Sequence, residues 1–294
     1  MTPPEALADL ATLSARIGAD PLQIQGPGGN TSLKDAGTMW IKASGTELRQ
    51  AVEREIFVAV DRDRARSEID GAGDGTCRAA LLDAEAGLRP SIETTFHAWF
   101  DAPVVLHTHS VAALAHVTSE EGTTHALQKL ADMHVAVVPY AKPGLPLTRA
   151  IAERAGRACV VLLRNHGLIV TGETVRDAAL RLAEVELRLA RRPERSITIE
   201  DLWVDDQAGR RARGGSYWPD HVVFCGPGLP ERDAAQGEKT RMMLRCLADV
   251  LERVPPEWSM VPIGPDAEAK LMDWDAEHYR RKLAGEEAGR PRGS

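Results

Sequence analysis

The chain has 294 residues, with 43 acidic and 36 basic side chains and a formal net charge of −7. This mixed, slightly negative balance argues against nucleic acid or an anionic membrane as a partner. No apolar run reaches the roughly 20 residues of a membrane-spanning helix, and the N-terminus lacks the basic and apolar stretches of a secretory signal, so we expect a cytoplasmic protein.

The beginning of the chain predicts a helix and then two small-residue turns. Residues 4–17 carry apolar side chains at helical spacing, with prolines at the start. Residues 26–32 (Gly-Pro-Gly-Gly-Asn-Thr-Ser) and 42–46 (Lys-Ala-Ser-Gly-Thr) are rich in hydroxyl and backbone N–H groups. Such segments are most often simple turns, but they also suit an anion, to which Lys34 or Lys42 would add positive charge.

The next segments predict strands at residues 39–43 and 56–60, a charged, glycine-rich surface segment at 62–75, and a helix at 93–100 that opens with Glu93. The helix macrodipole alone favours a glutamate in a first turn. The helix returns directly into the following apolar run, however, so Glu93 could also reach a site at the end of that run. There it would serve as a metal ligand or as an acid/base.

Three histidines lie close to the ends of predicted core strands. The apolar runs at residues 103–106 and 159–163 are typical of buried strands. His107 and His109 are two residues apart and therefore project to the same side, whereas His166 follows the second run. A single strand-end histidine is more often only a hydrogen-bonded polar residue. Three neutral imidazoles with an open fourth position, in contrast, are the ligand set of a catalytic zinc site.

The remaining pattern predicts the fold class. Further helices are expected at residues 111–116, 124–133, 147–156 and 173–190, and further strands at 135–138 and 168–171. The hairpin around His166 indicates an antiparallel sheet, so we expect a three-layer α/β/α sandwich with a mainly antiparallel central sheet. The glycine-rich turn has no strand-turn-helix context, which disfavours a nucleotide-dependent dehydrogenase.

The composition changes after residue 195. Residues 196–215 are polar and predict a solvated linker or loop, residues 216–230 contain an apolar, strand-like run, and residues 240–254 have helical periodicity. A last helix is expected through Leu271, Trp274 and Tyr279. We therefore divide the chain into a metal-binding catalytic domain, residues 1–195, and a mostly helical extension, residues 196–294, that packs on the core or on a neighbouring subunit.

Residues outside these patterns carry less information. His221 and His278 have no partner at metal-ligand spacing and are interpreted as packing or surface residues. The four cysteines are widely spaced, without a Cys-x-x-Cys pair, which favours reduced structural thiols.

Five blocks, taken in order, closely resemble the class II aldolase/adducin head-domain family over roughly residues 20–190. The blocks are Gly29-Asn30-Thr31-Ser32, Ser44-Gly45-Thr46, Pro90-Ser91-Ile92-Glu93, His107-Thr108-His109 and Asn165-His166-Gly167. The chain is most similar to the aldolase part of the bifunctional rhamnulose-phosphate aldolase/dehydrogenase proteins, and we expect no dehydrogenase half.

This resemblance implies a role for each block. His107, His109 and His166 would bind Zn²⁺ or another divalent ion such as Mn²⁺ or Co²⁺, and Glu93 would be the catalytic acid/base. The residues implied for the substrate or its phosphate are Gly29, Asn30, Thr31, Lys42, Ser44, Gly45 and Ser91. A homotetramer with sites at subunit interfaces is also implied.

Two positions depart from the family pattern. Many members carry two serines before the glutamate, whereas this chain has Ile92 at the second position, a change that weakens the expected phosphate site unless Lys34 or Lys42 compensates. The family's aldolases use a tyrosine as a second proton donor after the histidine pair. Residues 116–138 contain no tyrosine, and Tyr140 is the nearest candidate.

The resemblance therefore predicts a metal-dependent class II aldolase that reversibly cleaves a ketose, expected to be phosphorylated, through a metal-stabilised enediolate. A sugar-phosphate 4-epimerase or a decarboxylase would use the same site. A non-catalytic, adducin-like assembly domain is a further alternative, although such a domain has no need of a complete ligand set.

Overall fold

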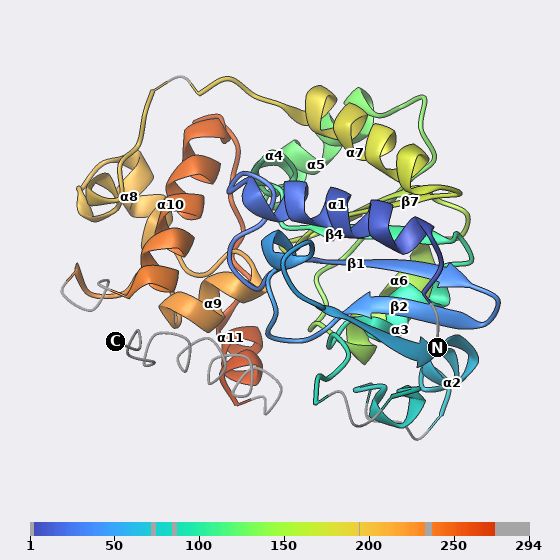
Figure 1. Ribbon diagram of the computed structural model, residues 1–294. Coiled ribbons are helices and arrows are strands. Elements are labelled where there is room, and N and C mark those ends of the chain that lie inside the picture. The colour runs from blue at the N-terminus through green and yellow to red at the C-terminus, as the bar shows by residue number, and fades with distance from the viewer. Residues whose placement is uncertain (1–2, 72–74, 84–86, 194, 233–236, 274–294) are drawn as a thin grey trace.

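The computed structural model describes residues 3–71, 75–83, 87–193, 195–232 and 237–273, and its centre is a single sheet (Figure 1). The strand order is β3 (Phe57–Asp61), β2 (Thr38–Lys42), β1 (Asn30–Asp35), β4 (Val104–Thr108), β7 (Gly167–Gly172), β6 (Val160–Leu163) and β5 (Val135–Val138). Neighbouring strands are antiparallel except β5 and β6, which are parallel. The sheet is mixed but mainly antiparallel, as predicted.

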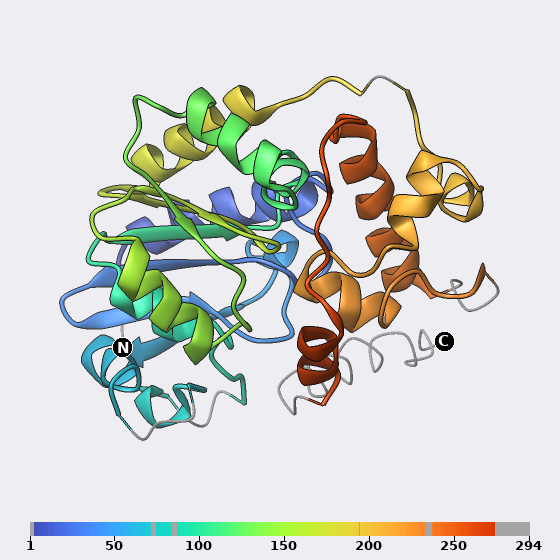
Figure 2. The same ribbon diagram turned by 180° about the vertical axis from the view of Figure 1, so that it is seen from behind.

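Helices cover both faces of the sheet, which confirms the predicted three-layer sandwich (Figures 1 and 2). One face carries α1 (Ala6–Ala19), α4 (Val111–Val117), α5 (Glu120–Lys129) and α7 (Val175–Leu189). The other carries α2 (Arg62–Ser67), α3 (Thr94–Trp99) and α6 (Leu145–Arg154). Several boundaries differ from the prediction by a few residues because caps set them: α5 begins early, for example, since the Ser119 hydroxyl accepts from the amide of Gly122.

The side chains of the central strands alternate between the two faces of the sheet and contribute to the hydrophobic core on each face. In β4, Val104 and Leu106 pack into the cluster beneath α1, α4 and α7, whereas Val105 packs into the cluster beneath α3 and α6. All three are fully buried. Side chains of a strand alternate between the two faces of a sheet, so a continuous apolar run is what a strand covered on both faces requires.

The strand β1 corrects one prediction. The turn expected over residues 26–32 ends at Gly29, and Asn30 already begins a central strand between β2 and β4. Apart from Leu33, its side chains are polar, so the segment lacks the apolar signature of a buried strand. The buried polar side chains form hydrogen bonds with residues outside β1, such as Ser14 in α1 and Glu93.

The segment after residue 195 forms helices that pack against one end of the sheet domain (Figures 1 and 2). They are α8 (Gln207–Ala212), α9 (Pro219–Cys225), α10 (Glu238–Arg253) and α11 (Pro265–Met272). The main contact with the sheet domain is that of α10 with α4. Within the described part of the chain, no helix is long and apolar enough to cross a membrane.

Two predictions in this segment are wrong. Residues 196–215 are not a solvated linker, because they contain α8 and because the Arg211 guanidinium donates to backbone carbonyls. The strand-like run after Ser216 is the helix α9, which begins at Pro219 and ends before Gly226 at a φ of +78°. A short apolar run fits either a strand or a buried helix. Trp274, Tyr279 and His278 lie outside the described residues.

Candidate metal centre

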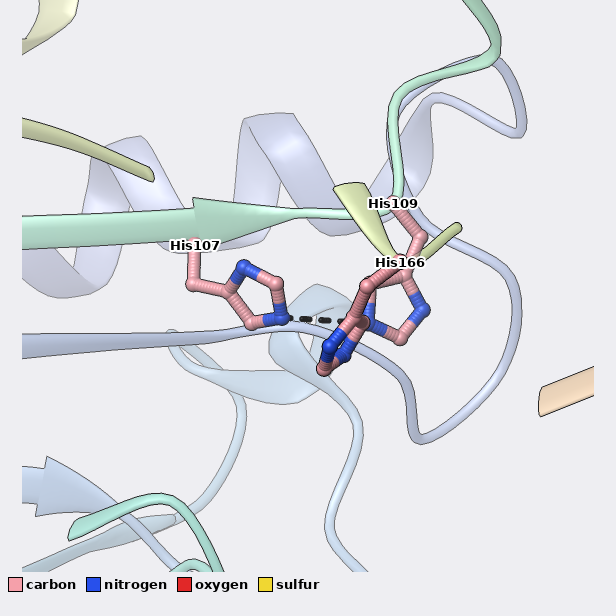
Figure 3. Close-up of side chains that lie close together, drawn as sticks. All are labelled: His107, His109 and His166. Atoms are coloured by element: carbon pink, nitrogen blue, oxygen red, sulfur yellow. Dashed lines mark hydrogen bonds between the residues drawn. The ribbon is translucent and has the colours of Figure 1, made fainter. Parts of the chain in front are cut away.

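The three predicted histidines come together at one end of the sheet (Figure 3). His107 lies in β4, His109 immediately follows that strand, and His166 lies in the turn between β6 and β7. Because β4 and β7 are paired, the turn that precedes β7 is brought beside the end of β4. All three side chains are buried, and one nitrogen of each lies within 4.8 Å of the others.

The neighbours of two imidazoles determine where their protons lie. His107 Nδ1 is 3.0 Å from the carbonyl oxygen of Leu168, and His109 Nδ1 is 2.9 Å from Oδ2 of Asp220. The Leu168 carbonyl oxygen accepts a hydrogen bond, so His107 Nδ1 carries the proton. Asp220 is at ion-pair distance from His109 Nδ1 without hydrogen-bond geometry, and its negative charge favours a proton on that nitrogen as well. Both Nε2 atoms therefore present lone pairs, and they face one another at 3.1 Å (Figure 3).

Two facing lone pairs repel unless a cation lies between them. A tetrahedral ion with bonds of about 2.0–2.1 Å separates its ligand nitrogens by roughly 3.3 Å, a value close to the observed separation. Burial, the largest influence, lowers the pKa of His107 to about 4 despite the opposing effect of the Glu93 charge. A proton is therefore disfavoured as the shared cation at neutral pH, and the donor set fits a divalent metal ion.

The carboxylate of Glu93 faces the same cluster. Glu93 immediately precedes α3 and is buried, with 4% of its surface exposed. Its Oε2 atom is 3.5 Å from His107 Nε2, and its Oε1 atom is 3.4 Å from His166 Nε2. Among the described residues, Oε1 has no hydrogen-bond partner. One carboxylate oxygen is thus buried and directed at the histidines, an arrangement that suits either a ligand or a proton acceptor.

A chain of buried hydrogen bonds holds Glu93. Asn30 Nδ2 donates to Glu93 Oε2 at 2.7 Å, and Asn30 Oδ1 accepts from Nε2 of His97. With its proton on Nε2, His97 accepts at Nδ1 from the hydroxyl of Ser32 at 2.7 Å. Burial, followed by the charges of Lys34 and His107, lowers the pKa of His97 well below its usual range and keeps the ring neutral. This arrangement fixes the orientation of the Asn30 amide and, through it, that of the Glu93 carboxylate.

Two residues at this centre were not predicted from the sequence. His97 lies four residues after Glu93, a spacing that places both on one side of a helix and could have identified it. Asp220 lies in α9, where nothing in the local sequence indicates a partner at His109. Gly28 stands beside this contact: a Cβ there would lie 2.6 Å from Asp220 Oδ2 and 2.9 Å from His109 Nδ1, so any larger residue would displace one of them.

A narrow pocket leads to the histidines, and it contains most of the residues predicted for the substrate. Six of the seven line it: Gly29, Asn30, Lys42, Ser44, Gly45 and Ser91. Thr31 does not, because β1 turns it to the opposite face, where its hydroxyl is 2.7 Å from that of Ser14. Lys34 is also elsewhere, with its ammonium group donating to the carbonyl oxygen of Ala102.

Tyr140, predicted as a second proton donor, does not line this pocket either. Its hydroxyl is buried, and it has no hydrogen-bond partner among the described residues. Burial, followed by the nearby charge of Glu268 in α11, raises the pKa of Tyr140 to about 12. The phenol therefore lies close enough to α11 for the charge of Glu268 to act on it, and it is outside the lining of the narrow pocket.

Comparisons with known proteins match most of the chain to one family. Residues 8–191 match the family model described as Class II Aldolase and Adducin N-terminal domain. The chain is 30% identical over 189 residues to the uncharacterized oxidoreductase YuxG of Bacillus subtilis, which covers 58% of this chain and 27% of that protein. It is 30% identical over 128 residues to a 3-oxo-tetronate 4-phosphate decarboxylase of Haemophilus influenzae, covering 37% of this chain and 60% of the relative. The chain thus spans less than two thirds of the length of these relatives.

A solved structure shares the fold. The N-terminal class II aldolase domain of a conserved protein from Thermoplasma acidophilum superposes with a TM-score of 0.55 at 24% sequence identity. The match covers 64% of this chain and 94% of that domain.

Proposed function

Because this chain belongs to the class II aldolase and adducin N-terminal domain family, we propose that it is a divalent-metal-dependent lyase that reversibly cleaves a carbon–carbon bond of a phosphorylated ketose. One observation carries the proposal: the Nε2 atoms of His107 and His109 face one another at 3.1 Å, with the carboxylate of Glu93 beside them. A domain used only for assembly gains nothing from holding two lone pairs and a carboxylate together in its interior.

His107, His109 and His166 would hold the ion, with Zn²⁺, Mn²⁺ and Co²⁺ all compatible with imidazole ligands. When bound, the ion supplies Lewis-acid stabilisation of the negative charge that develops on substrate oxygens. The hydrogen bond from His107 Nδ1 to the Leu168 carbonyl and the contact of His109 with Asp220 orient the two ligand nitrogens.

Glu93 would move the proton at carbon. Asn30 holds one carboxylate oxygen, and the other faces the histidines from within a buried site. Burial limits the water around Glu93, so its carboxylate exchanges a proton with the substrate carbon within the complex and with solvent between turnovers. Asn30 acts in this proposal by positioning Glu93, whereas Ser44, Gly45 and Ser91 bind substrate oxygens from the pocket wall. In the homotetramer implied by the resemblance, the second proton donor would come from a neighbouring subunit.

A decarboxylase is the second candidate, and the match to the Haemophilus protein named 3-oxo-tetronate 4-phosphate decarboxylase favours it. Loss of carbon dioxide from a 3-oxo acid leaves negative charge beside a carbonyl group, as aldol cleavage does. The histidines and Glu93 would therefore have the same roles in both reactions, and only the leaving fragment would differ.

A product assay separates the two reactions. Metal-loaded protein is incubated with a panel of phosphorylated ketoses and phosphorylated 3-oxo sugar acids, and aldehyde and carbon dioxide are measured separately. We expect aldehyde from a ketose. Carbon dioxide without aldehyde would identify a decarboxylase, and neither product from fully metal-loaded protein would contradict the proposed lyase.

A further inference from the structure

A cavity of about 490 Å³ lies where the chain leaves the sheet domain and enters the helical part. Its walls are the segment that follows α7, the helix α8 and the C-terminal end of α10. The helices α8 and α10 lie side by side (Figure 1). The cavity shares no described lining residue with the narrow pocket at the histidines, so a ligand in it would not take the place of the substrate.

Positive charge dominates this cavity. Five arginines and two carboxylates are among its described lining residues, an excess of three positive charges: Arg191, Arg192, Arg195, Arg211 and Arg253 against Asp206 and Glu252. The chain as a whole has a net charge of −7, so this arginine cavity departs from the average surface. The C-terminal end of α10 contributes roughly half of a negative charge, which is too little to cancel the excess.

The two carboxylates have arginine partners within the cavity. Arg195 Nη2 is 2.7 Å from Oδ2 of Asp206, and Arg253 Nη1 is 3.4 Å from Oε2 of Glu252. Each of these pairs is neutral overall. The excess of positive charge in the arginine cavity therefore belongs to the three other arginines.

Backbone carbonyl groups, which carry no net charge, hold two of those three. Arg191 Nε donates to the carbonyl oxygen of Arg253 at 3.0 Å, and the guanidinium carbon of Arg191 lies 5.0 Å from the centroid of the Trp258 ring. The Arg211 guanidinium donates to four carbonyl oxygens between Val254 and Trp258. Burial, the largest influence, lowers the pKa of Arg211, so neighbouring negative charges do not make up for its loss of water.

The third arginine, Arg192, is exposed, and it has no hydrogen-bond or ion-pair partner among the described residues. All of its N–H groups are therefore available to a ligand. It neighbours Arg191 in sequence, and both line the same cavity as Arg211. Like charges held together repel one another, and a multivalent anion between them relieves that repulsion.

The remaining surface of the arginine cavity is largely apolar. The apolar lining residues are Ile197, Ala208, Leu251, Val254, Pro255 and Pro256. Small-molecule sites typically combine such a surface with a few charged groups in a volume of about 300–1,000 Å³. The arginine cavity thus suits an anion with a carbon body better than an inorganic ion, which would leave most of the volume to water.

We propose that the arginine cavity binds a small organic anion that carries at least two negative charges, as phosphate or carboxylate groups, at a site separate from the metal centre. Arg191, Arg192 and Arg211 contact the anionic groups, and the apolar residues cover the carbon body. Guanidinium groups pair with phosphate and carboxylate oxygens alike, through two parallel N–H groups. Because Arg191 ends the family-matched part and Arg211 belongs to α8, the bound anion links the two parts of the chain.

Isothermal titration calorimetry of the full chain tests the proposal. ADP is the probe for an organic phosphate, citrate is the probe for an organic carboxylate, and uncharged adenosine is the control ligand. EDTA is present, so that an anion bound to a metal ion is not counted. We expect at least one of the two anions to bind once per chain, with a Kd of about 1 mM or tighter, and adenosine not to bind. Binding of neither anion, or equal binding of ADP and adenosine without binding of citrate, would overturn the proposal.

The variant Arg192→Gln tests which residues hold the anion. Arg192 has no described partner to lose, so the fold should be unchanged, and affinity for the anion should fall about tenfold. The matched control is Arg176→Gln, which removes another exposed arginine at the opposite end of α7, outside the arginine cavity. Circular dichroism spectra and melting temperatures show that the variants are folded. Equal affinity in the wild type and both variants would contradict the proposed site.

The variant Ser91→Ala distinguishes the arginine cavity from the substrate pocket. Ser91 lines the narrow pocket at the histidines and is not part of the arginine cavity. Its replacement should leave the affinity for the anion unchanged. A loss as large as that of Arg192→Gln would mean that the anion occupies the substrate pocket, and the proposal would be wrong. Since the titrations need no turnover, they decide the inference whether or not the proposed lyase activity is found.

Discussion

The candidate metal centre draws on two parts of the chain that contribute differently. The family-matched part, residues 8–191, supplies the three histidines and Glu93 and orients most of them internally, as when Leu168 binds His107 and Asn30 binds Glu93. The helical part after residue 195 supplies one carboxylate, Asp220, to His109. The proposed reactive groups thus belong to the sheet domain, whereas the orientation of one proposed ligand depends on a segment outside it.

The largest effect is expected within the family-matched part. Wild-type protein should carry about one divalent ion per chain, and His107→Ala or His166→Ala should lose both the ion and the activity, because each removes a ligand. Metal content is measured on purified protein by elemental analysis. The exposed His134 provides the control, since His134→Ala should retain the ion. Full occupancy in both ligand variants would rule out the assignment.

Glu93→Gln tests the same part of the chain without removing an imidazole ligand. Glutamine keeps the shape but cannot take up a proton, so kcat should fall by about 10²–10⁴ while metal content changes little. The wild type, given the ketone product alone, should exchange its α-hydrogen with deuterated water, and the variant should not. A variant that cleaves slowly but exchanges at the wild-type rate would leave Glu93 with a structural or ligand role.

Asp220→Asn tests the contribution of the helical part. Asparagine keeps the size but loses the negative charge beside His109 Nδ1, and metal affinity should fall by about 10–100-fold. At saturating metal, kcat should change much less, because Asp220 acts through His109. Asp266→Asn, an exposed substitution in the same part, is the control. Unchanged metal affinity in Asp220→Asn would mean that this part only covers the site.

The smallest effect concerns stability where the two parts meet. His116 in α4 is buried and packs edge-on against Trp258 from the helical part. Burial, the main cause, lowers the pKa of His116 to about 4 from an ordinary value near 6.5. Between these values the unfolded chain binds more protons than the folded chain, so the free energy of unfolding falls as the pH falls.

From pH 6.5 to 4.5 this loss should amount to about 2 kcal/mol for His116 alone. Urea titrations of the wild type and His116→Gln across that range measure it as the difference in slope. The exposed control variant His134→Gln should show the same pH dependence of the free energy of unfolding as the wild type. Parallel curves for the wild type and His116→Gln would show that His116 does not contribute.

The two parts of the chain differ in how well their structure could be predicted, because their sequences contain different kinds of pattern. The strands β4 and β6 are covered on both faces, so their apolar runs predicted them, and the histidines follow at their ends. The strand β1 was missed because most of its buried side chains are polar and form hydrogen bonds with partners distant in sequence, such as Glu93 for Asn30. No local pattern contains that information.

The helical part was predicted less well. The run in α9 is too short to separate a strand from a helix, and the arginines around Arg211 resemble a solvated segment until their carbonyl partners are known. Asp220 and Tyr140 show the same limit at the site: the first reaches His109 and the second does not reach the pocket, and both outcomes depend on how the C-terminal helices pack.

The contact between Asp220 and His109 also couples metal binding to the packing of α9 on the sheet domain. If Asp220 strengthens metal binding by holding His109, then a bound ion strengthens the seating of α9 against the sheet domain by the same factor. Metal binding would then slow amide hydrogen exchange away from the site, in α9 and in α10, which packs on α9. In such a chain, hydrogen exchange in the C-terminal helices would show whether the metal site is occupied.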